Sequence, residues 1–238
     1  MAEYFRFYGF CVISFLLLSS GAAGEEDVFA PEAGVSDRRR AMVPAMFIFG
    51  DSLIDNGNNN NLPSFAKANY FPYGIDFNGG PTGRFSNGYT MVDTIGLGLM
   101  GCIPSILAQS SNGICSREVN QLVLPFNTNA KAMINQLSAN LPGSKFSFID
   151  VQNMFQDLLA NARLYGFSVV NRGCCGIGRN RGQITCLPFQ MPCLDRNRYI
   201  FWDAFHPTAA VNILFGRNAF TGNQNMVYPI NIEQLAKL

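Results

Sequence analysis

Short runs of apolar residues alternate along this chain with segments whose apolar residues recur at helical spacing. Residues 45–49 and 199–202 have the unbroken apolar character of strands that are buried on both faces. Residues 146–150 alternate between apolar and polar side chains, as a further strand would. Strands separated by helices in this way predict an α/β fold in which helices cover a parallel sheet.

Three helices are predicted between and after these strands. Apolar residues recur at helical spacing from Ala130 to Leu141, and the pair that begins at Pro142 ends this helix. Residues 154–164 and 208–220 carry the same signal and follow predicted strands. Residues 74–88 are rich in glycine and predict a long loop.

The composition limits the class of protein. The chain has 238 residues, of which 48% are hydrophobic and 14% charged, so it can bury a core and is not disordered throughout. A net charge of +1 gives no long-range field that would attract nucleic acid or a membrane surface. His206 is the single histidine, which excludes a histidine-rich metal site. We predict no metal and no cofactor.

The N-terminus has the pattern of a targeting segment. An apolar run at residues 11–18 is followed by small residues at 19–24, which predicts a signal peptide over residues 1–24. The run is too short to cross the ~30 Å of hydrocarbon in a bilayer, so we expect a secreted protein without stable membrane insertion. Residues 25–44 are predicted to be a flexible leader, and residues 45–238 one domain.

The cysteines also indicate an oxidising compartment. Outside the predicted signal peptide there are six: Cys102, Cys115, Cys174, Cys175, Cys186 and Cys193. An even number in a secreted chain predicts disulfides. A bridge between the first two is favoured because the segment between them is short, and the other four would staple residues 174–193. A zinc site in that stretch is the alternative, although paired C-x-x-C spacings are absent.

Two short segments carry residues suited to catalysis. Ser52 follows the first predicted strand, and His206 follows a late one, so both would lie beyond the carboxyl ends of strands, where functional groups gather. A histidine can remove the serine proton if a carboxylate orients its ring, and Asp203 lies three residues before it. The Gly-x-Ser-x-Gly elbow is absent, which argues against an ordinary α/β-hydrolase.

Longer motifs extend this pattern to a family. The chain resembles the plant GDSL esterase/lipases of the SGNH hydrolase superfamily over about residues 45–235. The matching stretches are residues 50–60 (GDSLIDNGNNN), 82–88 (TGRFSNG), 101–104 (GCIP), 173–176 (GCCG) and 199–207 (YIFWDAFHP).

The resemblance implies a fold and a reaction. The fold would be a flavodoxin-like three-layer α/β/α arrangement with a parallel sheet, and the activity would be hydrolysis of carboxylic esters of small molecules or lipids. Ser52 would be the nucleophile, His206 the general base and then acid, and Asp203 the orienting carboxylate. The backbone N–H of Ser52 would be one donor of the oxyanion hole. No cofactor is implied.

The chain departs from the family in its centre. Two further blocks are expected between residues 82–88 and 101–104, and they contribute a glycine N–H and an asparagine side chain to the oxyanion hole. Only twelve residues stand there, which predicts an internal deletion near residues 94–100, with sheet elements missing. Asn56, Asn58 or Asn87 as a substitute donor is the alternative. The surfaces that the deletion exposes predict self-association.

Three functions remain open at this point. The first is an active secreted esterase or lipase. The second is a truncated isoform with impaired catalysis that binds an acyl group or a partner, or has no role. The third is a disulfide-stapled extracellular binding module. Ester hydrolysis that disappears in Ser52→Ala separates the first from the others.

Overall fold

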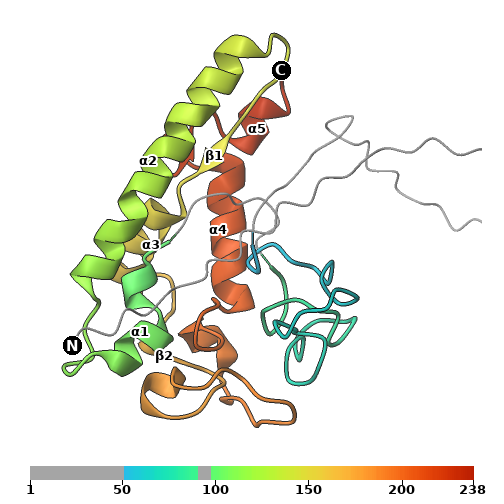
Figure 1. Cartoon of the computed structure of the whole chain (residues 1–238), viewed down its shortest axis with the longest axis vertical. Helices are drawn as coiled ribbons and strands as arrows, with labels where there is room; N and C mark the ends of the chain where they lie inside the picture. The colour runs from blue at the N-terminus through green and yellow to red at the C-terminus, as the bar shows by residue number, and fades with distance from the viewer. Residues whose placement is uncertain (1–50, 91–97) are drawn as a thin grey trace, which may run out of the picture. The chain divides into compact units, whose positions relative to one another are not determined.

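The computed structural model describes residues 51–90 and 98–238. The predicted signal peptide, the leader and the strand expected at residues 45–49 lie outside these residues, as does most of the predicted deletion site. Within them the chain contains both helices and strands, in keeping with the α/β class (Figure 1).

Five α-helices and three short 3-10 helices follow one another along residues 98–238. The α-helices are α1 (Pro104–Gln109), α2 (Arg117–Asn140), α3 (Val151–Ala160), α4 (Ala209–Thr221) and α5 (Ile232–Leu235). The 3-10 helices are η1 (Met100–Cys102), η2 (Arg179–Arg181) and η3 (Arg196–Arg198). The helices predicted at 154–164 and 208–220 are therefore confirmed as α3 and α4, with their ends shifted by a few residues.

The first half of α2 was missed by the sequence pattern, which predicted a helix only from Ala130. Pro125 interrupts the hydrogen-bond ladder, but the helix continues through it. The side chain of Ser116 caps the helix by accepting a hydrogen bond from the Val119 N–H, and Val123 lies on the buried face. Capping and burial thus extend the helix through a residue that normally ends one.

The strands form two small sheets rather than one large one. Strand β1 (Phe148–Ile149) pairs antiparallel with β4 (Val227–Tyr228). Strand β2 (Val169–Gly173) pairs in parallel with β3 (Tyr199–Phe201), with Val169 opposite Tyr199. The predicted strands at 146–150 and 199–202 are present, but the expected parallel sheet is reduced to the β2–β3 pair within the described residues. Apolar alternation identifies a strand, whereas its partner depends on which other strands are present.

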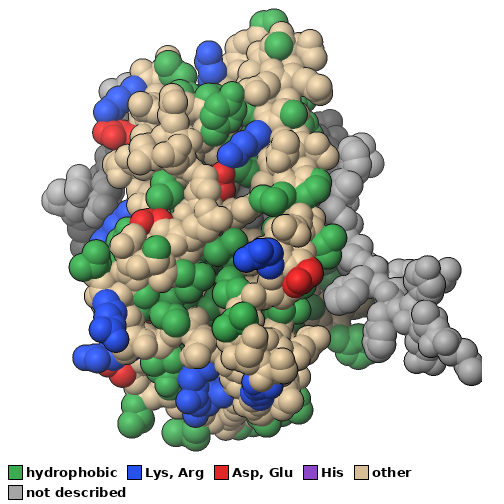
Figure 2. Space-filling model, turned by 90° about the vertical axis from the view of Figure 1, so that its left-hand side faces the viewer, with side chains coloured by type: hydrophobic (Ala, Val, Ile, Leu, Met, Phe, Trp, Pro, Cys, Tyr) green, Lys and Arg blue, Asp and Glu red, His purple; other side chains and the backbone are tan. Residues whose placement is uncertain are grey.

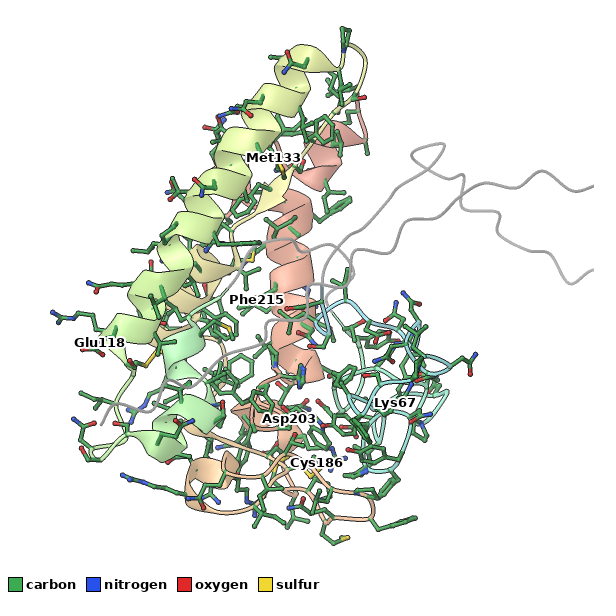
Figure 3. The ribbon with its side chains drawn as sticks, in the orientation of Figure 1. Lys67, Glu118, Met133, Cys186, Asp203 and Phe215 are labelled. Carbon is green, nitrogen blue, oxygen red and sulfur yellow. A yellow bond between two sulfur atoms is a disulfide. The ribbon has the colours of Figure 1, made fainter. Side chains whose placement is uncertain are left out.

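The main core lies between α3, β3 and α4. The rings of Phe155 on α3 and Phe215 on α4 meet edge to face at 4.9 Å, and Phe155 also stacks on Phe201 of β3 at 6.0 Å. Figure 3 shows Phe215 within the ribbon, between the longer helices. Leu53 packs against the same core, so the residue next to Ser52 is anchored there.

All six cysteines form disulfides. The predicted Cys102–Cys115 bridge is confirmed, and the remaining four pair as Cys174–Cys193 and Cys175–Cys186. These sulfurs are therefore not available to zinc, and the zinc alternative is wrong. Within residues 51–90 and 98–238, no helix combines the length and apolar character needed to cross a bilayer.

Residues 51–90 contain turns but no helix or strand. Their contacts with the remainder of the chain are both apolar and polar, since Ala68, Tyr73 and Phe85 form a buried cluster with Trp202 and three of the disulfide cysteines. Asn87 accepts a hydrogen bond from the Ala209 N–H at the start of α4, and Asp76 forms an ion pair with Arg196. The segment that begins with the predicted nucleophile is thus attached to a more regular scaffold.

Candidate active site

Asp203 and His206 lie on one tight loop that follows β3. The loop is closed at its base, because the Trp202 N–H donates to the His206 carbonyl oxygen at 2.7 Å. Asp203 is fully buried and His206 nearly so. The predicted three-residue spacing therefore places both side chains on one turn at the end of a buried strand; Figure 3 labels Asp203 there.

A continuous chain of hydrogen bonds links the three predicted residues. The Oγ of Ser52 lies 2.8 Å from Nε2 of His206, although the two residues are 154 positions apart. On the other side of the ring, Nδ1 lies 2.9 Å from each carboxylate oxygen of Asp203. A carboxylate at Nδ1 favours the tautomer that carries its proton there, which leaves Nε2 free to accept the serine proton.

The Asp203 carboxylate is fixed by four donors. Its Oδ1 accepts hydrogen bonds from the backbone N–H groups of Phe205 and His206, both at 2.8 Å. Burial alone would raise the pKa of Asp203, but the charge and hydrogen bond of His206, with the bonds from Tyr73 and Phe205, outweigh it and lower that pKa. Asp203 therefore stays ionised although it is buried.

Tyr73 joins these residues, although no sequence pattern indicates it. Its hydroxyl donates to Oδ2 of Asp203 at 2.6 Å, across 130 positions of sequence. The ring is buried and makes edge-to-face contacts with Tyr70, Phe85 and Trp202. Burial, followed by the charge of Asp203, raises the pKa of Tyr73, so the phenol keeps the proton that it donates. The one available signal was an aromatic run, residues 70–73, inside a polar loop.

The asparagines considered as oxyanion donors have other partners in two of the three cases. The Nδ2 of Asn87 donates one hydrogen bond to Asp76, and its Oδ1 accepts from the Ala209 N–H. The Oδ1 of Asn56 accepts a hydrogen bond from Thr90 at 2.5 Å. The role of Asn56, Asn58 or Asn87 as a donor stays a prediction.

Neither of two described surface hollows reaches the hydrogen-bonded chain. One of about 500 Å³ is lined by residues of α4 and η3, and the other of about 440 Å³ by residues around the end of α3. Ser52, Asp203 and His206 line neither hollow. In the part of the chain that the structure describes, no three His, Cys, Asp or Glu residues are grouped to hold a metal ion.

The chain matches known proteins over most of its length. The family model "GDSL-like Lipase/Acylhydrolase" matches residues 89–218, which is more than half of the chain. The chain is 39% identical to the Arabidopsis thaliana "GDSL esterase/lipase At1g71691" over 381 residues, covering 98% of this chain and 99% of the relative. It is 32% identical to "GDSL esterase/lipase At1g29670" of the same plant over 343 residues, covering 86% and 94%. The chain therefore belongs to the GDSL-like lipase/acylhydrolase family of carboxylic ester hydrolases.

Proposed function

We propose that this protein is a secreted serine hydrolase that cleaves carboxylic esters through Ser52, His206 and Asp203. The observation that carries the proposal is the hydrogen-bonded chain itself, in which Ser52 Oγ and Asp203 stand on opposite nitrogens of one imidazole ring. Such an arrangement of nucleophile, base and orienting carboxylate is the requirement for activating a serine.

The reaction follows from this arrangement. His206 Nε2 takes the proton of Ser52 as Oγ attacks the ester carbonyl carbon. The tetrahedral intermediate collapses when the C–O bond to the alcohol breaks, and His206 gives its proton to the departing oxygen. Water then attacks the acyl-enzyme with His206 as base, and the carboxylic acid leaves as Ser52 regains its proton. Asp203 stays ionised throughout and stabilises the imidazolium.

The oxyanion hole is where this chain would fall short. The Ser52 backbone N–H supplies one donor, and the family's glycine and asparagine donors are absent from the predicted deletion site near residues 94–100. The alignment with the first relative supports the deletion, because its 381 positions exceed the 238 residues of the chain. Each missing donor reduces the rate by about 10²–10³-fold, so we infer a slow enzyme.

The proposal includes where the protein acts and on which class of substrate. Three disulfides are typical of proteins that fold in an oxidising compartment, which supports secretion together with the predicted signal peptide. The substrate would be a small-molecule or lipid ester.

The flavodoxin-like three-layer arrangement is inferred for the family fold, of which β2 and β3 would be two parallel strands. Self-association through surfaces left by the deletion is a further expectation.

A catalytically impaired isoform is the second candidate function. The missing donors favour it, since a serine can be activated without the intermediate being stabilised. Such a protein would react with a probe at Ser52 yet turn over esters slowly, and its role would be to bind an acyl group or a partner.

A fluorophosphonate probe tests the proposal directly, because it reports an activated serine without requiring turnover. We expect labelling of the parent chain that is lost in Ser52→Ala and in His206→Ala. Ser144→Ala, which removes an exposed hydroxyl outside the site, should label like the parent. Hydrolysis of a short-chain p-nitrophenyl ester by the same samples then separates the two candidates. A folded, monodisperse parent that fails to label would overturn the proposal.

A further inference from the structure

Tyr73 extends the hydrogen-bonded chain beyond the three residues that activate a serine. Its hydroxyl donates to Oδ2 of Asp203 at 2.6 Å, and both oxygens of the same carboxylate lie 2.9 Å from Nδ1 of His206. The phenol and the imidazole therefore share one acceptor. A hydrogen bond to a carboxylate stabilises its charge, so less of that charge is left to attract a second proton donor.

Burial makes this competition strong. Figure 2 shows Lys, Arg, Asp and Glu side chains spread over one face of the molecule, where water screens their charges. Asp203 is 0% exposed and Tyr73 is 2% exposed, so water does not screen the bond between them. A hydrogen bond in which one partner is charged is about twice as strong as a neutral one.

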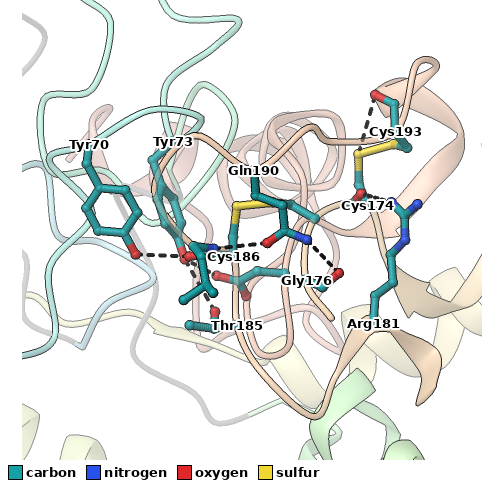
Figure 4. The surroundings of a disulfide bond; sticks show 12 residues. Tyr70, Tyr73, Cys174, Gly176, Arg181, Thr185, Cys186, Gln190 and Cys193 are labelled. Carbon is teal, nitrogen blue, oxygen red and sulfur yellow. Dashed lines mark hydrogen bonds between the residues drawn. A yellow bond between two sulfur atoms is a disulfide. The ribbon is translucent and has the colours of Figure 1, made fainter. Parts of the chain in front are cut away.

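The phenol is the donor in this bond. Burial, followed by the negative charge of Asp203, raises the pKa of Tyr73, so the proton stays on the hydroxyl oxygen. The same hydroxyl lies 3.4 Å from Oγ1 of Thr185, a contact that Figure 4 shows. A phenol has one hydrogen, and Asp203 accepts it, so Thr185 is the donor in the longer contact.

The place of the carboxylate does not depend on Tyr73. Its Oδ1 accepts hydrogen bonds from the backbone N–H groups of Phe205 and His206, both on its own loop. Removal of the phenol hydroxyl therefore leaves Asp203 beside the imidazole. What changes is the strength with which the carboxylate attracts the imidazole proton.

Titratable side chains face Asp203 from two segments. His206 comes from the same loop, and Tyr70 and Tyr73 come from residues 51–90. Of the two phenols, Tyr73 is bonded to the carboxylate, whereas Tyr70 donates to a backbone carbonyl. Tyr73 is therefore the phenol placed to act on the charge of Asp203.

The imidazole itself has neutral neighbours. Phe85 packs against the ring of His206 with centroids 4.9 Å apart, and the Ser52 hydroxyl lies 2.8 Å from Nε2. Phe205 meets the ring edge to face at 6.1 Å. These three side chains carry no charge, so the charge that acts on the imidazole is that of Asp203.

We propose that Tyr73 is a positioning residue that acts through Asp203 to weaken the hold of the imidazole on its second proton, which keeps more of His206 in the neutral form. Without the phenol, the buried carboxylate would stabilise the imidazolium more strongly, and the ring would stay protonated to a higher pH. The inference rests on the proposed function, because a neutral His206 is what accepts the proton of Ser52.

Nitrogen NMR of a chain that carries isotope-labelled histidine tests this directly, because His206 is the single histidine. The full secreted chain, made without a histidine tag, is titrated through the range in which histidine takes up its proton. We expect the midpoint for Tyr73→Phe to lie about one pH unit above that of the parent, a tenfold change in the protonation equilibrium. The variant keeps the buried ring and should fold. Tyr228→Phe, which removes a hydroxyl bonded to the neutral Asn135 side chain, should titrate as the parent does.

The rate of fluorophosphonate labelling is the second readout. Tyr73→Phe should label about tenfold more slowly than the parent below the midpoint, and at about the parent rate well above it, where both rings are neutral. Slowing by the same factor at every pH, with an unmoved midpoint, would show a structural role and overturn the proposal. A midpoint that falls would also overturn it. A parent that does not label, in a pair that still shows the shifted midpoint, would overturn the proposed function and leave the action of Tyr73 on the imidazole supported.

Discussion

The two parts of the described chain hold their share of the proposed active site with different amounts of regular structure. Residues 98–238 carry Asp203 and His206 on a scaffold of helices and strands packed around the main hydrophobic core. Residues 51–90 carry Ser52 on turns without a helix or strand, and they contribute Ala68, Tyr73 and Phe85 to a second, smaller buried cluster with Trp202. The position of Ser52 therefore depends more on individual side-chain contacts than on helices and strands.

The difference teaches that the segments carrying the proposed base and the proposed nucleophile need not have the same stability. Proteins open locally, and segments with few buried apolar contacts open at the lowest free energy. The Asp203–His206 pair should therefore persist while the Ser52 segment opens. Substitutions in the two parts should therefore differ in how far they lower the free energy of unfolding and in how many residues they expose to exchange.

Phe215→Ala should have the largest effect, because it removes a buried ring of the core part. Phe215 is 1% exposed and packs edge to face on Phe155. Large-to-small changes at such sites lower the free energy of unfolding by about 3–5 kcal/mol. Urea unfolding followed by circular dichroism measures the loss. Phe220→Ala on the same helix is the control, since Phe220 is partly exposed and should lose much less. Equal losses would show that α4 is not the centre of the core.

Lys67→Met should destabilise the other part. The Lys67 ammonium donates to the carbonyls of Asn59, Asn60 and Leu62, and so ties the turns after Ser52 together. Hydrogen bonds to a charged group contribute about 1.5–3 kcal/mol each to stability. In the variant, water can hydrogen-bond to the freed carbonyls and offset part of this loss. We expect faster amide hydrogen exchange within residues 51–90 and unchanged exchange in the core.

The matched control for this variant is Lys145→Met, at an exposed lysine outside the loop. Its exchange pattern should equal that of the parent. Loss of protection across α3 and α4 in Lys67→Met would contradict the separation of the two parts.

Tyr73→Phe tests the contact that joins the parts, and we expect a loss of about 1 kcal/mol at pH 7. The pKa of Asp203 is lowered in the folded protein, so its stabilising contribution is present above the unfolded value of about 3.9 and is lost as the pH falls through the folded value. Without the Tyr73 hydroxyl that pKa rises toward the unfolded value. The difference between variant and parent should therefore shrink from pH 7 to pH 3.

Tyr228→Phe is the control for pH dependence, because its hydroxyl donates to the neutral Asn135 side chain. Urea unfolding at the two pH values should show a difference from the parent that changes little. A Tyr73→Phe deficit that is equally independent of pH would mean that the phenol does not act on the carboxylate.

Asp76→Asn should have the smallest effect. Burial alone would raise the pKa of Asp76, but the hydrogen bonds from Arg196 and Asn87 and the charge of Arg196 lower it. The ion pair is about one-third exposed, so its loss should lower stability at neutral pH by less than about 1 kcal/mol, and by less still at high salt. Because folding lowers the pKa of Asp76, the stability difference between variant and parent is present at neutral pH and fades as the pH falls below about 4. Asp195→Asn, in a more exposed pair, should change nothing measurable.

The sequence predicted what depends on short spacing and on pattern. Asp203 and His206 share one loop, so their three-residue spacing was enough to predict that they lie together. Ser52 was predicted near them because functional groups gather beyond the carboxyl ends of strands. Tyr73 could not be found, because its partner lies on another segment and no periodicity links the two. Likewise, apolar alternation identified β1 but did not reveal that it would pair antiparallel with β4. Partners chosen by three-dimensional packing leave no mark in a local pattern.

The disulfides close short loops, with separations of 13, 19 and 11 residues, and all of them lie within residues 98–238. Among the described residues, no bridge ties the Ser52 part to the part that holds its base. One peptide cleavage between residues 90 and 98 would therefore yield two chains joined by non-covalent contacts alone. The cleaved protein would behave as a split form of the proposed enzyme, in which the fragment that carries Ser52 could be added back in trans and its assembly titrated.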